Sequence, residues 1–115
     1  GPETFSQFDE VIVLAEGRVI FAGPIDDVVS YFANLGYTLP ATMDVADFLQ
    51  MLPTPDGATF FDPSRAAALN GDVNTQHYTP QQFAKAFKES EYGMDIEKDL
   101  KAAHPLPWTA SAGWT

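Results

Sequence analysis

The chain has 115 residues, enough for one small domain, and 45% of them are apolar, which excludes a chain that is disordered throughout. Sixteen acidic residues against six basic ones give a formal charge of −10, which argues against nucleic acid or an anionic membrane surface as a partner. The sequence has no cysteine, which excludes disulfides and thiolate catalysis, and no apolar run approaches the roughly 20 residues of a membrane-spanning helix.

The first elements in chain order form a predicted β-hairpin. Residues 10–14 are a continuous apolar run rich in β-branched side chains, typical of a strand buried on both faces, and residues 18–21 are a second such run. Gly17 lies between them and takes a positive φ at little cost. We expect Gly23-Pro24 to end the second strand.

Helical periodicity follows the hairpin. An apolar stripe made by Ile25, Val28, Val29, Phe32 and Leu35 predicts a first helix that Gly36 ends. Residues 37–40 are expected to be extended. A second helix is predicted to begin at the capping residue Asp44 and to end at Pro53.

The stretch from Pro53 to Tyr78 is predicted to be mostly loop, because prolines and glycines recur in it. A short helix is expected within it at residues 63–69, with Asp62 as its cap. These elements and those that follow predict an α+β fold in which an N-terminal antiparallel hairpin precedes three to five short helices.

The clearest helix start is Thr79-Pro80-Gln81-Gln82, where Thr79 and Gln82 form a predicted capping box. Its buried stripe is expected to be Phe83, Ala86 and Phe87. We expect Gly93 to interrupt the helix and a further helix to run from Ile96 to Ala103, before the prolines that follow.

The sequence contains no recognisable nucleotide-binding loop. A phosphate-binding loop ends in Gly-Lys followed by Ser or Thr, and no lysine of this chain follows a glycine. The five serines stand outside any Gly-x-Ser-x-Gly pattern. We therefore predict no catalytic, cofactor-binding or metal-binding residue in this chain; the lysines are Lys85, Lys88, Lys98 and Lys101, and the serines are Ser6, Ser30, Ser64, Ser90 and Ser111.

The remaining chemistry-bearing residues favour structural roles. His77 and His104 stand far apart in predicted loops, so a solvated loop histidine is favoured over a zinc ligand. The acidic pairs Asp9-Glu10 and Asp26-Asp27 are interpreted as a strand start and a helix first turn, because adjacent strand residues face opposite sides. The two tryptophans, Trp108 and Trp114, are typical of a tail that packs on a partner.

Four blocks of this sequence resemble ABC transporters of the G subfamily, specifically the full-length pleiotropic drug resistance type. In the first block, Pro-Glu-Thr-Phe at residues 2–5 is followed by Phe-Asp-Glu-Val-Ile-Val-Leu-Ala-Glu-Gly-Arg-Val-Ile-Phe-Ala-Gly-Pro at residues 8–24. Residues 28–36 are similar to the helix that follows in that family. Residues 44–49 resemble its Ala-Asp-Phe-Leu motif, and residues 78–100 are similar to a later helical segment.

The resemblance implies a piece of an ATP-driven exporter of lipids or hydrophobic drugs, on the cytosolic side of a membrane. Residues 1–36 would be the last strands and helix of a P-loop nucleotide-binding domain, residues 37–104 its helical extension, and residues 105–115 a linker toward the transmembrane domain. The motifs that hold ATP and magnesium would precede residue 1. Residues 2–5 would be the part of this chain closest to the nucleotide, with Glu3 or Thr4 affecting that site in the longer protein, and the chain itself would catalyse nothing.

The partners implied are the rest of the nucleotide-binding domain and the transmembrane domain. An exposed apolar strand also favours pairing with a second copy, so we expect the isolated chain to self-associate. The alternative that the sequence leaves open is a stand-alone acidic protein-interaction domain.

Overall fold

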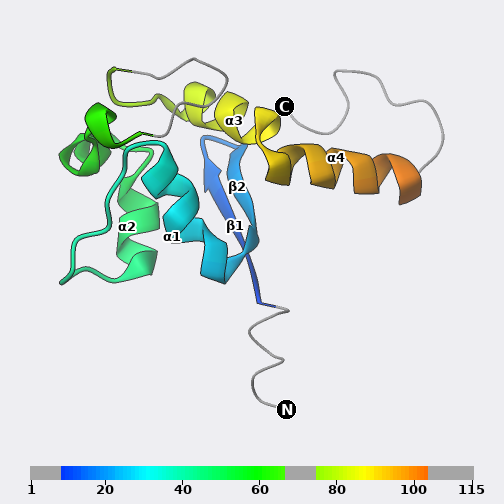
Figure 1. The fold of residues 1–115 in the computed structure, drawn as a ribbon, viewed down its shortest axis with the longest axis horizontal. Coiled ribbons are helices and arrows are strands. Elements are labelled where there is room, and N and C mark those ends of the chain that lie inside the picture. The colour runs from blue at the N-terminus through cyan, green and yellow to red at the C-terminus, as the bar shows by residue number, and fades with distance from the viewer. Residues whose placement is uncertain (1–8, 67–74, 104–115) are drawn as a thin grey trace, which may run out of the picture.

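The structure is a computed structural model that describes residues 9–66 and 75–103. Figure 1 shows a two-stranded hairpin in the middle of the molecule, with α1 and α2 on one side of it and α3 and α4 along one end. The predicted α+β class, an antiparallel hairpin followed by helices, is confirmed. The elements are β1 (Glu10–Ala15), β2 (Arg18–Pro24), α1 (Ile25–Asn34), α2 (Val45–Met51), the 3₁₀ helices η3 (Pro55–Phe60) and η4 (Pro63–Arg65), α3 (Pro80–Glu89) and α4 (Glu91–Ala103).

The hairpin turns at two residues with positive φ, Glu16 at 52° and Gly17 at 76°. Two consecutive positive φ values match the right-handed twist of the strands, which is why such turns close tight hairpins. The pairing runs from Glu10 opposite Pro24 to Ala15 opposite Arg18, with an irregularity after Val13. The second strand therefore extends to Pro24, beyond the end that we predicted.

The expectation that β1 is buried on both faces is wrong for the described chain. Val13 and Ala15 are buried, whereas Ile12 is 65% exposed and Leu14 is 61% exposed. Successive strand residues point to opposite faces, so only one face of β1 meets the core. The run looked uniformly apolar because its exposed positions are as hydrophobic as its buried ones.

The helix α1 forms as predicted, and the chain that follows it contacts the segment around Phe61. Val28, Phe32 and Leu35 are buried, but Ile25 is exposed and Tyr31 takes its place in the core. Gly36 ends the helix with φ 104°, and a Cβ there would lie 2.9 Å from the carbonyl oxygen of Asp62. That close approach brings Tyr37 into an antiparallel bridge with Phe61.

The stretch predicted to be mostly loop contains more structure than expected. Its described part holds η3 and η4, and Phe60 is buried against Phe48 of α2, with ring centroids 5.1 Å apart. Asp62 caps η4 as predicted, but that helix has three residues, and Leu69 lies outside the described residues. Asp44 does precede α2, yet its side chain makes no capping hydrogen bond.

The pair α3 and α4 is joined at Ser90. The capping box of α3 is confirmed: Gln82 donates its backbone N–H to the Thr79 hydroxyl, and Thr79 donates its own to the Gln82 side chain. Gly93 does not interrupt a helix, because it lies inside α4. A Cβ on Gly93 would be 2.2 Å from the carbonyl oxygen of Phe87, so glycine is present for close packing.

One continuous core joins the whole described molecule. Of the two strands, β2 is the one more closely packed by α1, α3 and α4, and its Ile20 and Phe21 are fully buried. The ring of Phe21 meets those of Tyr31, Phe87 and Tyr92 at centroid distances of 5.0, 5.8 and 5.3 Å. We predicted a division between residues 36 and 37 within a longer protein, and that division stays a prediction. In the described residues, side chains from both sides of it share this core.

Candidate functional site

The most distinctive surface is the outer face of the hairpin, which we define as Ile12 and Leu14 of β1. These two side chains stand opposite Ala22 and Val19 of β2, which are partly buried. Large apolar side chains exposed together on an edge strand mark a surface that pairs or packs with something else. This face is therefore the candidate functional site, an interaction surface.

Acidic residues flank this outer face. Glu10 begins β1, Glu16 follows its last residue and Asp9 precedes the strand; all three are exposed. Asp9 has a structural role as well, since its carbonyl oxygen accepts the backbone N–H of Ile25 at 3.1 Å. The pair Asp9-Glu10 thus belongs to a strand start, as the sequence indicates.

The second acidic pair belongs to the first turn of α1. Asp26 is exposed, and Asp27 accepts a hydrogen bond from the Tyr92 hydroxyl at 3.2 Å. Desolvation and the neighbouring Asp27 carboxylate raise the pKa of Tyr92, so this hydroxyl stays protonated and donates. The contact ties α1 to α4 and holds one carboxylate, which makes it structural rather than an acid–base pair.

His77 is not the solvated loop histidine that the sequence favours. It is half-buried, and both ring nitrogens are engaged: Nε2 lies 2.8 Å from the carbonyl oxygen of Thr54, and Nδ1 lies 2.6 Å from the hydroxyl of Tyr37. A carbonyl only accepts, so Nε2 is the ring nitrogen that donates to Thr54, and in the tautomer with its proton on Nε2 the Nδ1 atom accepts from Tyr37. The Tyr37 oxygen in turn accepts the backbone N–H of Tyr78 at 2.9 Å.

This junction joins three distant stretches of chain around residues 37, 54 and 77. Burial raises the pKa of Tyr37, which keeps its hydroxyl protonated as a donor to His77. All donors and acceptors in the chain of bonds are matched. The junction therefore fastens the segment before α3 to the core, and sequence reasoning missed it because no local pattern relates Tyr37 to His77.

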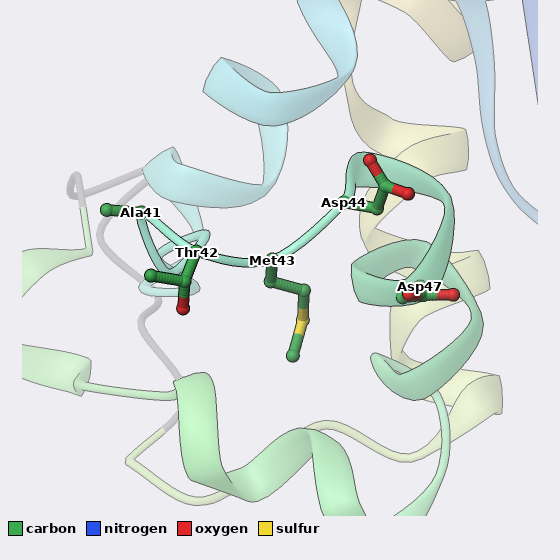
Figure 2. A pocket seen from close by; sticks show the side chains of 5 residues that line it. All are labelled: Ala41, Thr42, Met43, Asp44 and Asp47. Carbon is green, nitrogen blue, oxygen red and sulfur yellow. The ribbon is translucent and has the colours of Figure 1, made fainter.

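An open hollow lies at the start of α2 and is lined by Ala41, Thr42, Met43, Asp44 and Asp47. Figure 2 shows Met43 on the connecting segment, and Asp44 and Asp47 at the beginning of the helix. The hollow is wide open to solvent, and its two carboxylates face no basic partner among the residues that line it. It offers no enclosed site for a ligand.

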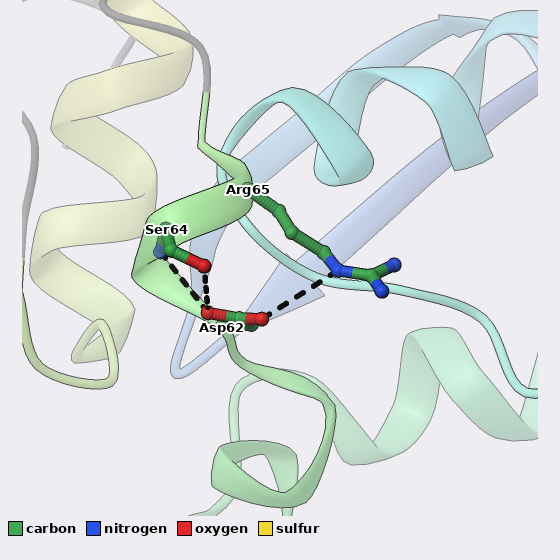
Figure 3. Close-up of polar contacts among 3 residues, drawn as sticks. All are labelled: Asp62, Ser64 and Arg65. Atoms are coloured by element: carbon green, nitrogen blue, oxygen red, sulfur yellow. Dashed lines mark hydrogen bonds and ion pairs between the residues drawn. The ribbon is translucent and has the colours of Figure 1, made fainter.

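Asp62 gathers the polar contacts of η4, as Figure 3 shows. Its carboxylate accepts from the hydroxyl and the backbone N–H of Ser64 at 2.6 and 3.1 Å and lies 3.5 Å from Nε of Arg65. These hydrogen bonds, with the Arg65 charge, hold the pKa of Asp62 below its usual range. The cluster is exposed, and Asp62 caps a single turn.

The other residues singled out in the sequence take local structural roles or lie outside the described ranges. Ser30 and Ser90 donate to carbonyl oxygens three residues earlier, so neither is aimed at a base. Phe83 and Phe87 are core residues, as predicted. Within the described ranges no group of three or more metal-ligating side chains gathers. Residues outside those ranges are Glu3, Thr4, Ser6, His104, Trp108, Ser111 and Trp114.

No helix found within residues 9–66 and 75–103 has both the length and the apolar character needed to cross a bilayer.

Comparison with known proteins gives a consistent result. The family model described as ABC-2 type transporter matches residues 3–60. The chain is 39% identical over 105 residues to ABC transporter G family member 51 of rice, an alignment that covers 89% of this chain. It is 38% identical over 103 residues to member 31 of Arabidopsis thaliana, covering 88% of the chain, and 34% identical over 116 residues to member 32, covering 96%.

The chain spans about 7% of the length of each of these relatives. The resemblance to ABC transporters of the G family that the sequence indicates is confirmed as far as the family is concerned. The comparisons support a transporter fragment over a stand-alone interaction domain.

Proposed function

The chain belongs to the ABC-2 type transporter family, and we propose that it forms the C-terminal part of the nucleotide-binding domain of an ATP-driven exporter of the pleiotropic drug resistance type, with the segment that leads toward the transmembrane domain. In this proposal ATP and magnesium are bound elsewhere in the exporter, and the chain is a non-catalytic element on the cytosolic face. The exported compounds are lipids or hydrophobic drugs.

The observation that carries the proposal is the uncovered outer face of the hairpin. The helices cover the inner face and leave Ile12 and Leu14 exposed beside an edge without a neighbouring strand among the described residues. Such an arrangement is expected of the last strands of a larger sheet whose other strands belong to a different part of the polypeptide. A nucleotide-binding domain of the P-loop type supplies a sheet of that kind.

The test is ATP hydrolysis by the longer exporter that contains this chain, reconstituted in lipid vesicles. Placing charges on the outer face with Ile12→Asp and Leu14→Asp is expected to lower hydrolysis by at least about tenfold, since a carboxylate is costly where the sheet continues. Met94→Asp is the matched control, because Met94 is 57% exposed on α4 and far from the face in sequence. We expect that variant to hydrolyse ATP within about twofold of the unaltered exporter.

Three results would refute the proposal. The first is full hydrolysis by the exporter that carries both aspartates. The second is binding or hydrolysis of ATP by the 115-residue chain alone. The third is transport of a fluorescent phospholipid and a hydrophobic dye that proceeds equally well without ATP.

A further inference from the structure

We propose that the backbone edge of β1, next to the outer face, is a docking edge for an apolar β-strand flanked by lysine or arginine residues. The remainder of the longer polypeptide supplies this strand. This inference rests on the proposed function for the source of the strand. It goes further by stating the chemistry of the partner.

We place the docking edge on β1 rather than on β2 because the large exposed apolar side chains of the sheet lie on β1. Within residues 9–66 and 75–103 the sheet contains β1 and β2 only, and α1, α3 and α4 contact β2 more than β1. Ile12 and Leu14 stay more than half exposed, while Val13 between them is buried. A strand added beside β1 would satisfy its outer backbone groups, and its own apolar side chains would cover Ile12 and Leu14.

The charge on this edge selects the partner. Glu10 and Glu16 stand at the two ends of the apolar stretch, and Asp9 adds a further negative charge at the start. The one basic residue between Asp9 and Pro24 is Arg18, which lies on β2. Opposite charges across a strand pair stabilise it and like charges oppose it, so the complementary strand is basic at its ends.

A second copy of the chain is a poorer occupant by the same rule. Antiparallel pairing of two β1 strands centred on Val13 places Ile12 opposite Leu14, which is favourable, but places Glu10 opposite Glu16 at both ends. Each copy also carries a formal charge of −10. Self-association is therefore opposed electrostatically, although its apolar centre fits.

The length of the relatives indicates where the strand comes from. The chain corresponds to about 7% of each relative, so most of the polypeptide lies outside it. A strand in the same polypeptide is present at a high effective concentration, which favours it over a partner that must diffuse.

The experiment is an NMR titration of the ¹⁵N-labelled 115-residue chain with two synthetic peptides. Both peptides carry the same alternating Val-Thr centre, and one has lysine at each end where the other has glutamate. We expect the lysine peptide to bind at least about tenfold more tightly and to shift the amide signals of β1. Salt at about 0.5 M should reduce that preference, because it screens exposed charges.

Two variants make the titration decisive. Glu10→Lys combined with Glu16→Lys is expected to reverse the preference, so that the glutamate peptide binds more tightly. Leu14→Lys is expected to abolish binding of both peptides, and Met94→Lys, equally exposed on α4, is expected to leave binding unchanged.

Equal binding of the two peptides, or shifts confined to other elements, would overturn the proposal. Concentration-dependent dimers in light scattering that Leu14→Lys dissolves would overturn it too, by assigning the edge to a second copy. ATP hydrolysis by the longer exporter is measured separately, so a failed titration leaves the proposed function open to its own test.

A second measurement uses the longer exporter and does not depend on the isolated chain being folded. A photo-reactive benzoylphenylalanine replaces Leu14, and mass spectrometry identifies the cross-linked peptide. An apolar segment of the same polypeptide with basic residues at its ends is the expected product. A segment with acidic ends, or a second copy of β1, would refute the inference.

Discussion

The two strands of the hairpin have similar sequences and opposite surroundings. In β2, Ile20 and Phe21 are fully buried, whereas in β1 two large apolar residues of similar character, Ile12 and Leu14, face solvent. The difference lies in the neighbours, since the helices cover β2 and leave one face of β1 open. Hydrophobicity alone therefore does not distinguish a residue that is buried in this chain from one that stays exposed.

The largest expected effect follows from removing the centre of the covered strand. Phe21→Ala deletes a ring that meets four other aromatic rings, and we expect it to lower the free energy of unfolding by about 3–5 kcal/mol. Ile12→Ala on the open strand is the matched control and should change it by less than about 0.5 kcal/mol. Urea unfolding followed by circular dichroism measures both, and equal losses would remove the contrast between the strands.

The next largest effect on stability is expected at Gly93, where α4 packs closely against the end of α3. Gly93→Ala places a Cβ within van der Waals overlap of the Phe87 carbonyl, so we expect a loss of about 2–3 kcal/mol in the same unfolding assay. Gly17→Ala is the control, because nothing lies within 4 Å of the added carbon there and the positive φ costs only about 1 kcal/mol. A neutral Gly93→Ala would mean that the two helices separate without penalty.

A smaller effect is expected at the junction of Tyr37 and His77. Tyr37→Phe keeps the ring but leaves the N–H of Tyr78 and Nδ1 of His77 without this partner, which should cost about 1–2 kcal/mol. His77→Leu breaks the same chain of bonds from the other side. The double variant should lose less than the sum of the two single losses, and strict additivity would show that the bonds do not act together.

The smallest effect is a pH dependence at the exposed Asp62. Its folded-state pKa is lowered, so it stabilises the fold above the pKa of the unfolded chain, and this contribution is lost as pH falls through the folded-state pKa. Thermal unfolding of Asp62→Asn should therefore depend less on pH below about 4. Ser64→Ala removes one hydrogen bond to the carboxylate and should shift the NMR titration of Asp62 upward. An unchanged titration would contradict the assignment of cause.

Elements with a local signature were predictable from sequence. The turn at Gly17, the end of α1 at Gly36 and the capping box of Thr79 and Gln82 all depend on residues close together in the chain. Their physical causes are positive φ and unsatisfied helix amides, which act within a few residues.

Features that depend on distant segments were not predictable in this way. Gly93 looked like a helix breaker because its reason for being glycine, the carbonyl of Phe87, belongs to the preceding helix. His77 looked solvated because Tyr37 is 40 residues away. The candidate site lay between these cases: the apolar run was visible, but which of its residues face outward depends on where the helices pack.

The joint at Ser90 has a mechanical consequence. Met94 donates its backbone N–H to the Ser90 carbonyl, Gly93 donates to the Ser90 hydroxyl, and Gly93 lies against the end of α3, so the direction of α4 is fixed at its first turn. Figure 1 shows α4 running away from the hairpin. A helix of 13 residues is about 20 Å long, so a tilt of about 10° at the joint displaces its far end by roughly 3 Å. A small rotation at Ser90 therefore produces a larger displacement at Ala103.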